Sequence, residues 1–281
     1  MQCDRLIKNG TIVDGTGRSS FKGDIAIKDG RINAITSLGN NPGDSWESTQ
    51  VINAENLTVC PGFIDIHSHS DFLLPLKEHP ARLACLLEQG ITTIVGGNCG
   101  FSPAPLAEDS KYMGFVQRDF EFNSGRPLDI SWTSMGSFFS FLEESGLSLN
   151  LAQLTGHGTL RKSLWGTDYS LPNQEKMRQM SQIIEESFSE GAYGLFLGLG
   201  YEPGMYVAMK ELEEIALLVK RHDRLLTVHI KALARASSAY KSSFLVKPHN
   251  IRAIAEMIEI ARMMNCSSNE AYLRPEKNLP E

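Results

Sequence analysis

The stretch Pro-Gly-Phe-Ile-Asp-Ile-His-Ser-His-Ser-Asp, residues 61–71, marks a change in the pattern of the sequence. Before it, residues 1–60 alternate apolar and polar side chains around turn residues, which predicts β-strands. After it, residues 61–266 alternate short apolar runs with helical patterns, which is typical of βα units around a parallel sheet. The stretch itself predicts the first strand of that sheet, at residues 63–68.

His67 and His69 give the strongest chemical signal in the sequence. Side chains at positions i and i+2 of a strand point to the same side, ~6.5–7 Å apart, so two imidazoles placed in this way can hold one metal ion. In barrels made of βα units the active site lies at the carboxyl ends of the strands, where these two residues fall. Two histidines in a surface turn are the alternative, and the flanking sequence favours the metal site.

Five βα units are predicted within residues 61–266. Their strands are expected at residues 63–68, 91–95, 149–154, 193–197 and 225–230. The clearest helix, at residues 173–190, carries apolar side chains on one face: Met177, Met180, Ile184 and Phe188. The last helix is marked by Ile251, Ile254, Ile258 and Ala261.

A closed barrel needs eight such units, and the polar tail at residues 267–281 predicts no further strand. We therefore predict an α/β fold, an incomplete TIM-type (β/α) barrel of about five of the eight units. We expect the chain to stop before the barrel closes.

Residues 1–60 predict the N-terminal part of a small β-sandwich domain. Asp29-Gly30 lies between two alternating runs, and this pair favours the type I′ turn of a hairpin because both residues tolerate positive φ. Asn9-Gly10 predicts a second hairpin, between residues 6–7 and 11–13. Residues 38–49 are rich in Gly, Asn, Pro and Ser, which predicts a loop.

Composition and charge exclude several classes of protein. The 281 residues carry a net charge of −6, from 33 acidic and 27 basic side chains, with no run of Lys and Arg that would favour a nucleic-acid partner. The N-terminus has no apolar signal core, and no apolar run approaches the ~18 residues of a membrane span. Five widely spaced cysteines, an odd number, favour free thiols and a cytoplasmic location. The sequence carries no signal of oligomeric state.

Two further residues at predicted strand ends are candidate metal ligands. Cys99 follows the second strand within Gly-Gly-Asn-Cys-Gly, residues 96–100, and a cysteine thiolate binds zinc at ~2.3 Å. His229 ends the fifth strand. The alternatives are a packed thiol and a hydrogen-bonded histidine, and the position at the strand ends favours ligands. A packed thiol is the prediction for the remaining cysteines, which are Cys3, Cys60, Cys85 and Cys266.

His157 and Tyr201 are candidate substrate-binding residues. His157 is predicted to lie on the loop after the third strand, where its ring would contact the substrate or orient a metal ligand. Tyr201 lies in the glycine-rich stretch 198–204 after the fourth strand, and it would line the pocket or serve only as a turn residue. No Gly-Lys-Ser/Thr follows these glycines, so they do not predict a phosphate site.

Three segments together resemble a known family. They are Leu-Ile-Lys-Asn-Gly-Thr-Ile-Val-Asp-Gly-Thr-Gly at 6–17, the stretch 61–71, and Gly-Asn-Cys-Gly-Phe-Ser at 97–102. The sequence resembles the D-aminoacylase, or N-acyl-D-amino-acid deacylase, branch of the amidohydrolase superfamily, from about residue 4 to about residue 265.

This resemblance implies one or two Zn²⁺ ions held by His67, His69, Cys99 and His229, and a small N-acyl amino acid as substrate. It also implies a histidine at the end of a sixth strand and a general-base aspartate at the end of an eighth, and neither has a counterpart in this sequence. No catalytic residue is therefore assigned within residues 1–281.

Three functions remain to be compared. The first is hydrolysis of a linear amide in an N-acyl-D-amino acid. The second is hydrolysis of a cyclic amide, as in the dihydropyrimidinases and hydantoinases, which usually carry a carboxylated lysine on the fourth strand. Residues 192–199 contain no lysine, which argues against it. The third is a catalytically inactive metal-binding fragment, which the missing strands favour.

Overall fold

A computed structural model of the chain describes residues 2–37, 46–108, 110–240 and 247–264. The chain divides into two compact units, residues 1–63 and 64–281, and each is described by itself. Cys266 and the tail predicted at residues 267–281 lie outside the described residues, as does most of the loop predicted at 38–49.

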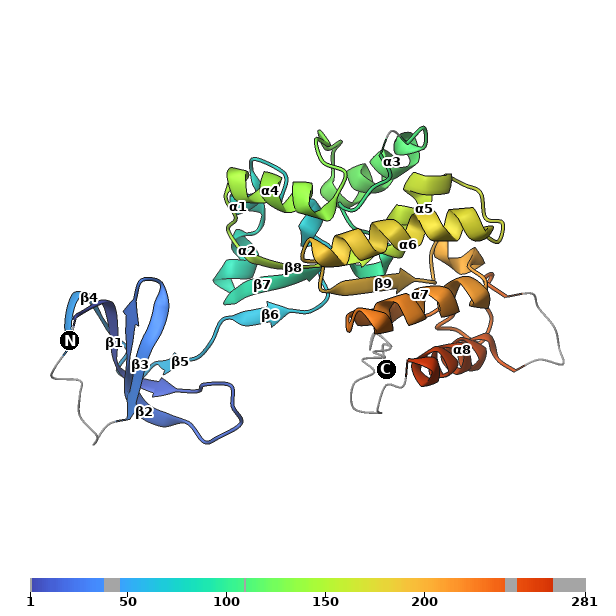
Figure 1. The fold of residues 1–281 in the computed structure, drawn as a ribbon. Coiled ribbons are helices and arrows are strands. Elements are labelled where there is room, and N and C mark those ends of the chain that lie inside the picture. Colours follow the sequence, from blue (N-terminus) through green and yellow to red (C-terminus); the bar gives the residue numbers. More distant parts are fainter. Residues whose placement is uncertain (1, 38–45, 109, 241–246, 265–281) are drawn as a thin grey trace. The chain divides into compact units, whose positions relative to one another are not determined.

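The first unit is a small sheet with the strand order β3-β2-β1-β4, and β5 pairs with β1 (Figure 1). Its strands are β1 (Gln2–Ile12), β2 (Phe21–Lys28), β3 (Arg31–Ser37), β4 (Glu47–Asn53) and β5 (Thr58–Val59). The hairpin predicted at Asp29-Gly30 is confirmed, because β2 and β3 are antiparallel neighbours on either side of it. Both turn residues have positive φ, 51° and 71°, as a type I′ turn requires.

The hairpin predicted at Asn9-Gly10 is wrong, because β1 runs through both residues as one strand. The pairing of β1 with β2 instead shifts between Ile7 and Gly10, which marks a β-bulge. Asn9 has a φ of 64°, and its backbone N–H donates to the buried Asp24 carboxylate at 2.8 Å. The positive φ that Asn favours therefore serves a bulge within one strand instead of a turn between two.

The second unit contains a curled, five-stranded parallel sheet with the order β10-β9-β8-β7-β6 (Figure 1). The strands are β6 (Phe63–Asp65), β7 (Ile91–Gly96), β8 (Asn150–Gly156), β9 (Gly194–Gly198) and β10 (Leu225–His229). Neighbours in the chain are neighbours in the sheet, and the pairs β7–β8, β8–β9 and β9–β10 are parallel. This is the order of a (β/α) barrel, so the predicted partial-barrel fold is confirmed.

Strand β6 is shorter than predicted, since it ends at Asp65 and not at residue 68. The Asp65 side chain accepts a hydrogen bond from the backbone N–H of His67 at 3.1 Å, which turns the chain out of the strand. His67 and His69 therefore lie on the segment beyond the strand end.

Helices and short 3-10 turns connect the strands. The turns are η2 (Ser70–Phe72), η3 (Asn98–Gly100) and η4 (Gly204–Tyr206). The helices are α1 (His79–Arg82), α2 (Ala84–Glu88), α3 (Met113–Ser124), α4 (Met135–Ser145), α5 (His157–Trp165), α6 (Gln174–Ser189), α7 (Met209–Arg221) and α8 (His249–Met263). Polar side chains cap the starts of two helices: at α4 Ser134 forms a capping box with Ser137, and at α6 the Asn173 side chain accepts the N–H of Lys176.

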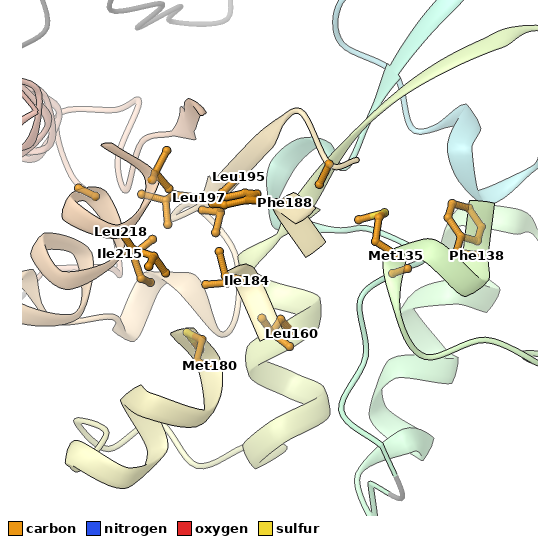
Figure 2. Close-up of a cluster of buried hydrophobic side chains, with 14 of the residues drawn as sticks. Met135, Phe138, Leu160, Met180, Ile184, Phe188, Leu195, Leu197, Ile215 and Leu218 are labelled. Carbon is orange, nitrogen blue, oxygen red and sulfur yellow. The ribbon is translucent and has the colours of Figure 1, made fainter. Parts of the chain in front are cut away.

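The main core lies between the parallel sheet and helices α6 and α7 (Figure 2). The four side chains predicted to share one face of α6 are all buried. They pack with the fully buried strand β9 and with α7, and the cluster includes Met180, Ile184, Phe188, Leu195, Leu197, Ile215 and Leu218.

Helix α8 shows that an apolar pattern can mark a helix without marking its buried face. Its stripe of Ile251, Ile254 and Ile258 is 41–48% exposed. The buried side chains are those of His249, Ala253, Met257 and Ile260, on a different face.

This contrast predicts unequal costs for the same substitution. Ile184→Ala removes a side chain with no exposed surface, so we expect the free energy of unfolding to fall by ~2–5 kcal/mol in urea titrations. Ile251→Ala is the matched control, because this side chain is 48% exposed, and its effect should stay within about 0.5 kcal/mol. Equal losses at the two positions would contradict the described packing.

Among the helices of the described segments, none combines the length and the apolar character that crossing a membrane requires.

Candidate metal centre

The structure brings the predicted ligands from three strand ends to one place. One potential ligand atom from each of His67, His69 and Cys99 lies within 4.8 Å of the other two. The Cys99 Sγ is 3.5 Å from Nε2 of His67 and 3.7 Å from Nδ1 of His229. His229 thus adjoins the three-residue group through the sulfur.

The backbone around Cys99 is shaped to present its side chain. Cys99 lies in η3 with a φ of 56°, a conformation that residues other than glycine adopt uncommonly. The preceding Gly97 has a φ of 81°, and a Cβ there would lie 2.1 Å from the carbonyl oxygen of Leu154. Only glycine fits at position 97, so the glycine-rich stretch after β7 allows a tight bend of the backbone before Cys99.

Tyr201 lies beside His229, at the end of β10. Its hydroxyl is 3.4 Å from Nδ1 of His229, and the ring centroids are 4.6 Å apart. A Cβ at Gly200 would meet the His229 ring at 2.7 Å, so the absence of a side chain there makes room for the ring. The structure therefore places Tyr201 against the candidate ligands, and its substrate-binding role stays a prediction.

Aromatic side chains border the ligand group. The ring centroid of Phe101 lies 6.5 Å from that of His69 and 5.8 Å from that of Tyr201. Phe196, a buried residue of β9, makes an edge contact with the His67 ring at 5.9 Å. These rings lower the local polarity and strengthen the electrostatic interactions of any charge held there.

His157 does not lie on a loop, as was predicted, because it is the first residue of helix α5. Its side chain is fully buried, and Nε2 lies 3.0 Å from Oε1 of Glu211. The same oxygen accepts a hydrogen bond from Nε of Arg161 at 3.1 Å. Burial alone would raise the pKa of Glu211, but the hydrogen bonds and charges of His157 and Arg161 outweigh it and hold that pKa below its usual value.

The sequence predicted no role for Asp71, and the structure shows that its buried side chain connects the segments that carry the candidate ligands. Its side chain is fully buried in η2, and Oδ2 accepts hydrogen bonds from the N–H of Gly97 at 2.8 Å and from the side-chain amide of Gln153 at 3.1 Å. Burial raises the pKa of Asp71 to about 6, although these hydrogen bonds oppose the rise. The one feature of the sequence that could have indicated a role for Asp71 is its position at the end of the motif 61–71.

Cys3, Cys60 and Cys85 are free thiols, but they are not all packed. Cys3 is buried, as predicted. The prediction is wrong for Cys60 and Cys85, which are exposed.

The donor set suits zinc. Thiolate sulfur and imidazole nitrogen are the ligands that zinc prefers in proteins, and three or four of them complete a site. His67, His69 and Cys99 offer such atoms together, and His229 lies at contact distance from the sulfur. The residues present therefore fit the implied cofactor.

A parallel sheet of βα units with histidine and cysteine side chains gathered beyond its strand ends is the architecture of metal-dependent (β/α)-barrel hydrolases. No protein-family model matches the chain. It is 30% identical over 267 residues to an N-acyl-D-glutamate deacylase of Alcaligenes xylosoxydans xylosoxydans, covering 94% of this chain and 49% of the relative. It is 28% identical to the N-acyl-D-aspartate deacylase of the same organism, covering 94% and 48%.

A solved structure agrees with these relatives. The N-acyl-D-glutamate deacylase of Bordetella bronchiseptica, complexed with zinc and a phosphonate mimic of the tetrahedral intermediate, matches with a TM-score of 0.77 and 30% identity. The match covers 95% of this chain and 50% of the solved one, so the chain spans about half the length of the relatives it matches. The chain is a homologue of N-acyl-D-amino-acid deacylases, and the resemblance to them seen in its sequence is confirmed.

Proposed function

We propose that this chain carries the zinc-binding part of a hydrolase of linear amides, most specifically an N-acyl-D-amino-acid deacylase. The observation that carries the proposal is the meeting of Cys99 with His67 and His229 at 3.5 and 3.7 Å, although these residues lie up to 162 positions apart in the sequence. His69 completes the donor set. The homologous deacylases support the choice of reaction.

The roles of the side chains follow from their chemistry. A zinc ion held there would act as a Lewis acid toward an amide carbonyl and would lower the pKa of a water molecule. Cys99 would bind as a thiolate, and the imidazoles of His67, His69 and His229 would bind through neutral nitrogens. Phe101 and Tyr201 would border the substrate and limit the access of water.

Strand β9 and its flanks favour a linear amide over a cyclic one. Residues 192–199, which include all of β9, contain no lysine that could be carboxylated and bridge two metal ions, as in the cyclic-amide hydrolases. One or two zinc ions remain compatible with the proposal. A cytoplasmic location is also proposed, and the free thiols of Cys3, Cys60 and Cys85 support it.

Ligand binding tests the substrate class separately from turnover. In calorimetric titrations, the zinc-loaded protein should bind N-acetyl-D-glutamate with higher affinity than its L enantiomer or hydantoin. Preferential binding of hydantoin would favour the cyclic-amide alternative instead. Binding of all three with equal affinity would contradict the proposed substrate class.

The isolated 281-residue chain should have little or no deacylase activity. Among the described residues, the ligand group contains no carboxylate that could serve as the general base. We expect no release of free D-glutamate from N-acetyl-D-glutamate above the zinc-only background in an amine-detection assay. Robust turnover by the purified protein would contradict this prediction and exclude the inactive-fragment alternative.

A further inference from the structure

One buried side chain connects the loops that carry the candidate ligands. Asp71 follows His69 by two residues and has no exposed surface. Its Oδ2 accepts the backbone N–H of Gly97, two residues before Cys99, at 2.8 Å. The same oxygen accepts the side-chain amide of Gln153, in the neighbouring strand β8, at 3.1 Å. A single carboxylate oxygen thus connects the segment after β6, the segment after β7 and strand β8.

A second bridge runs beside the first in the opposite direction. The amide of Asn98, which is 1% exposed, donates to the carbonyl oxygen of Ser68 at 3.0 Å and to that of Val95 at 2.6 Å. Gly97 and Asn98 precede Cys99, while Ser68 and Asp71 flank His69. Gly97 and Asn98, the two residues before Cys99, are therefore each hydrogen-bonded to a residue that flanks His69.

The side chains around these two sets of hydrogen bonds are closely packed. A Cβ at Gly96 would lie 2.6 Å from the Cβ of Asp71 and 2.6 Å from Oε1 of Gln153. Cys99 itself has a φ of 56°, a backbone conformation that persists only where its surroundings hold it. The Asp71–Gly97 hydrogen bond acts on the backbone just before that residue, and a charged acceptor makes it stronger than a neutral one.

We infer that Asp71 is a positioning residue that fixes Cys99 relative to His67 and His69 and so sets the metal affinity of the group. Asp71 acts through the backbone of Gly97, and it is not a member of the ligand group itself. This inference rests on the proposed metal site. Outer residues that orient metal ligands typically change metal affinity about 10–100-fold when they are replaced.

The test measures Co²⁺ binding, because a thiolate bound to Co²⁺ gives a charge-transfer absorption that reports the sulfur contact directly. The intact protein and the variants Asp71→Ala, Asp71→Asn and Gln153→Ala are titrated with CoCl₂ in competition with a chelator. We expect Asp71→Ala to weaken Co²⁺ binding about 10–100-fold and to reduce the sulfur-to-cobalt absorption. Asp71→Asn keeps an acceptor oxygen, and Gln153→Ala keeps the hydrogen bond between Asp71 and Gly97. Both variants should therefore lose less Co²⁺ affinity than Asp71→Ala.

Asp24→Asn is the matched control. Asp24 is also a buried carboxylate that accepts a backbone N–H at 2.8 Å, but it lies in the first unit. Its replacement should leave both the affinity and the absorption unchanged. If Asp71→Ala does not fold, the two milder variants decide, and a loss of at least about threefold with reduced absorption in Asp71→Asn supports the inference.

Two failures are distinguishable. If the unaltered protein binds Co²⁺ without the sulfur absorption, the proposed metal site itself is wrong. If the unaltered protein shows the absorption and the folded Asp71 variants match it in affinity and spectrum, the metal site stands and the positioning role of Asp71 is overturned.

Discussion

Cys99→Ala should lower the zinc affinity of the protein by about 100-fold or more. Zinc binding to a site of this ligand type is worth roughly 10–16 kcal/mol, so one of four ligands carries roughly 3 kcal/mol, which corresponds to more than a factor of about 100. The thiolate also brings the negative charge that compensates the ion, and alanine removes it. Chelator competition followed by metal analysis measures the change.

His229→Ala should have an effect of the same kind, because its Nδ1 lies 3.7 Å from the sulfur. Cys85→Ala is the control for loss of a thiol as such, since Cys85 is exposed and lies outside the ligand group. It should leave zinc affinity unchanged. An unchanged zinc stoichiometry in both Cys99→Ala and His229→Ala would remove the two residues as ligands.

Arg161→Met should destabilise the protein by about 3–5 kcal/mol, because it removes the guanidinium that pairs with the buried Glu211 carboxylate. Both side chains are at most 1% exposed, and Arg161 also donates to the carbonyl oxygens of Asp168 and Ser170 at 2.8 and 3.0 Å. Urea unfolding at pH 7 measures the loss. The double variant Arg161→Met with Glu211→Gln should recover part of it, since the amide carries no charge.

The matched control for this ion pair is Arg178→Met. Arg178 pairs with Glu175 at 2.7 Å, but both side chains are 65% exposed, so water screens the pair and the loss of stability should be much smaller than at Arg161. Comparable losses at the buried and exposed pairs would contradict the role assigned to burial.

The pH dependence of the buried pair has a definite sign. The pKa of Glu211 is lowered in the folded protein, so its contribution to stability is fully present above the ordinary value of 4.5. The contribution is lost as the pH falls through the lower pKa of the folded state. The double variant should therefore show a weaker decline in stability below pH 4.5 than the unaltered protein.

Local patterns predicted the elements of the fold well where several signals agreed. The helix predicted at residues 173–190 is found at Gln174–Ser189 with its apolar face buried as expected, and an Asn cap and a following glycine mark its two ends. The sequence pattern was less informative where the same residue type is favoured in two different local structures. Asn9 favours positive φ equally in a turn and in a bulge, and only the distant Asp24 carboxylate decides between them.

The candidate site was predicted by residue type and strand position, and its distances required the fold. His67 and Cys99 lie 32 residues apart, and His229 a further 130, so no local pattern reports that they meet. His157 was misplaced because Gly-His-Gly suggests a loop, whereas tertiary packing against Glu211 begins a helix there. Asp71 was missed because its partners are distant in the sequence: Gly97 follows strand β7, and Gln153 lies in strand β8.

X-ray absorption spectroscopy at the zinc edge tests the shared metal site most directly, because sulfur and nitrogen neighbours give separate shells around the ion. The zinc-loaded protein should show one sulfur at ~2.3 Å together with nitrogen neighbours at ~2.0–2.1 Å, and Cys99→Ala should lose the sulfur shell. A spectrum of the unaltered protein with only nitrogen and oxygen neighbours would contradict the assignment of Cys99, His67, His69 and His229 to one ion.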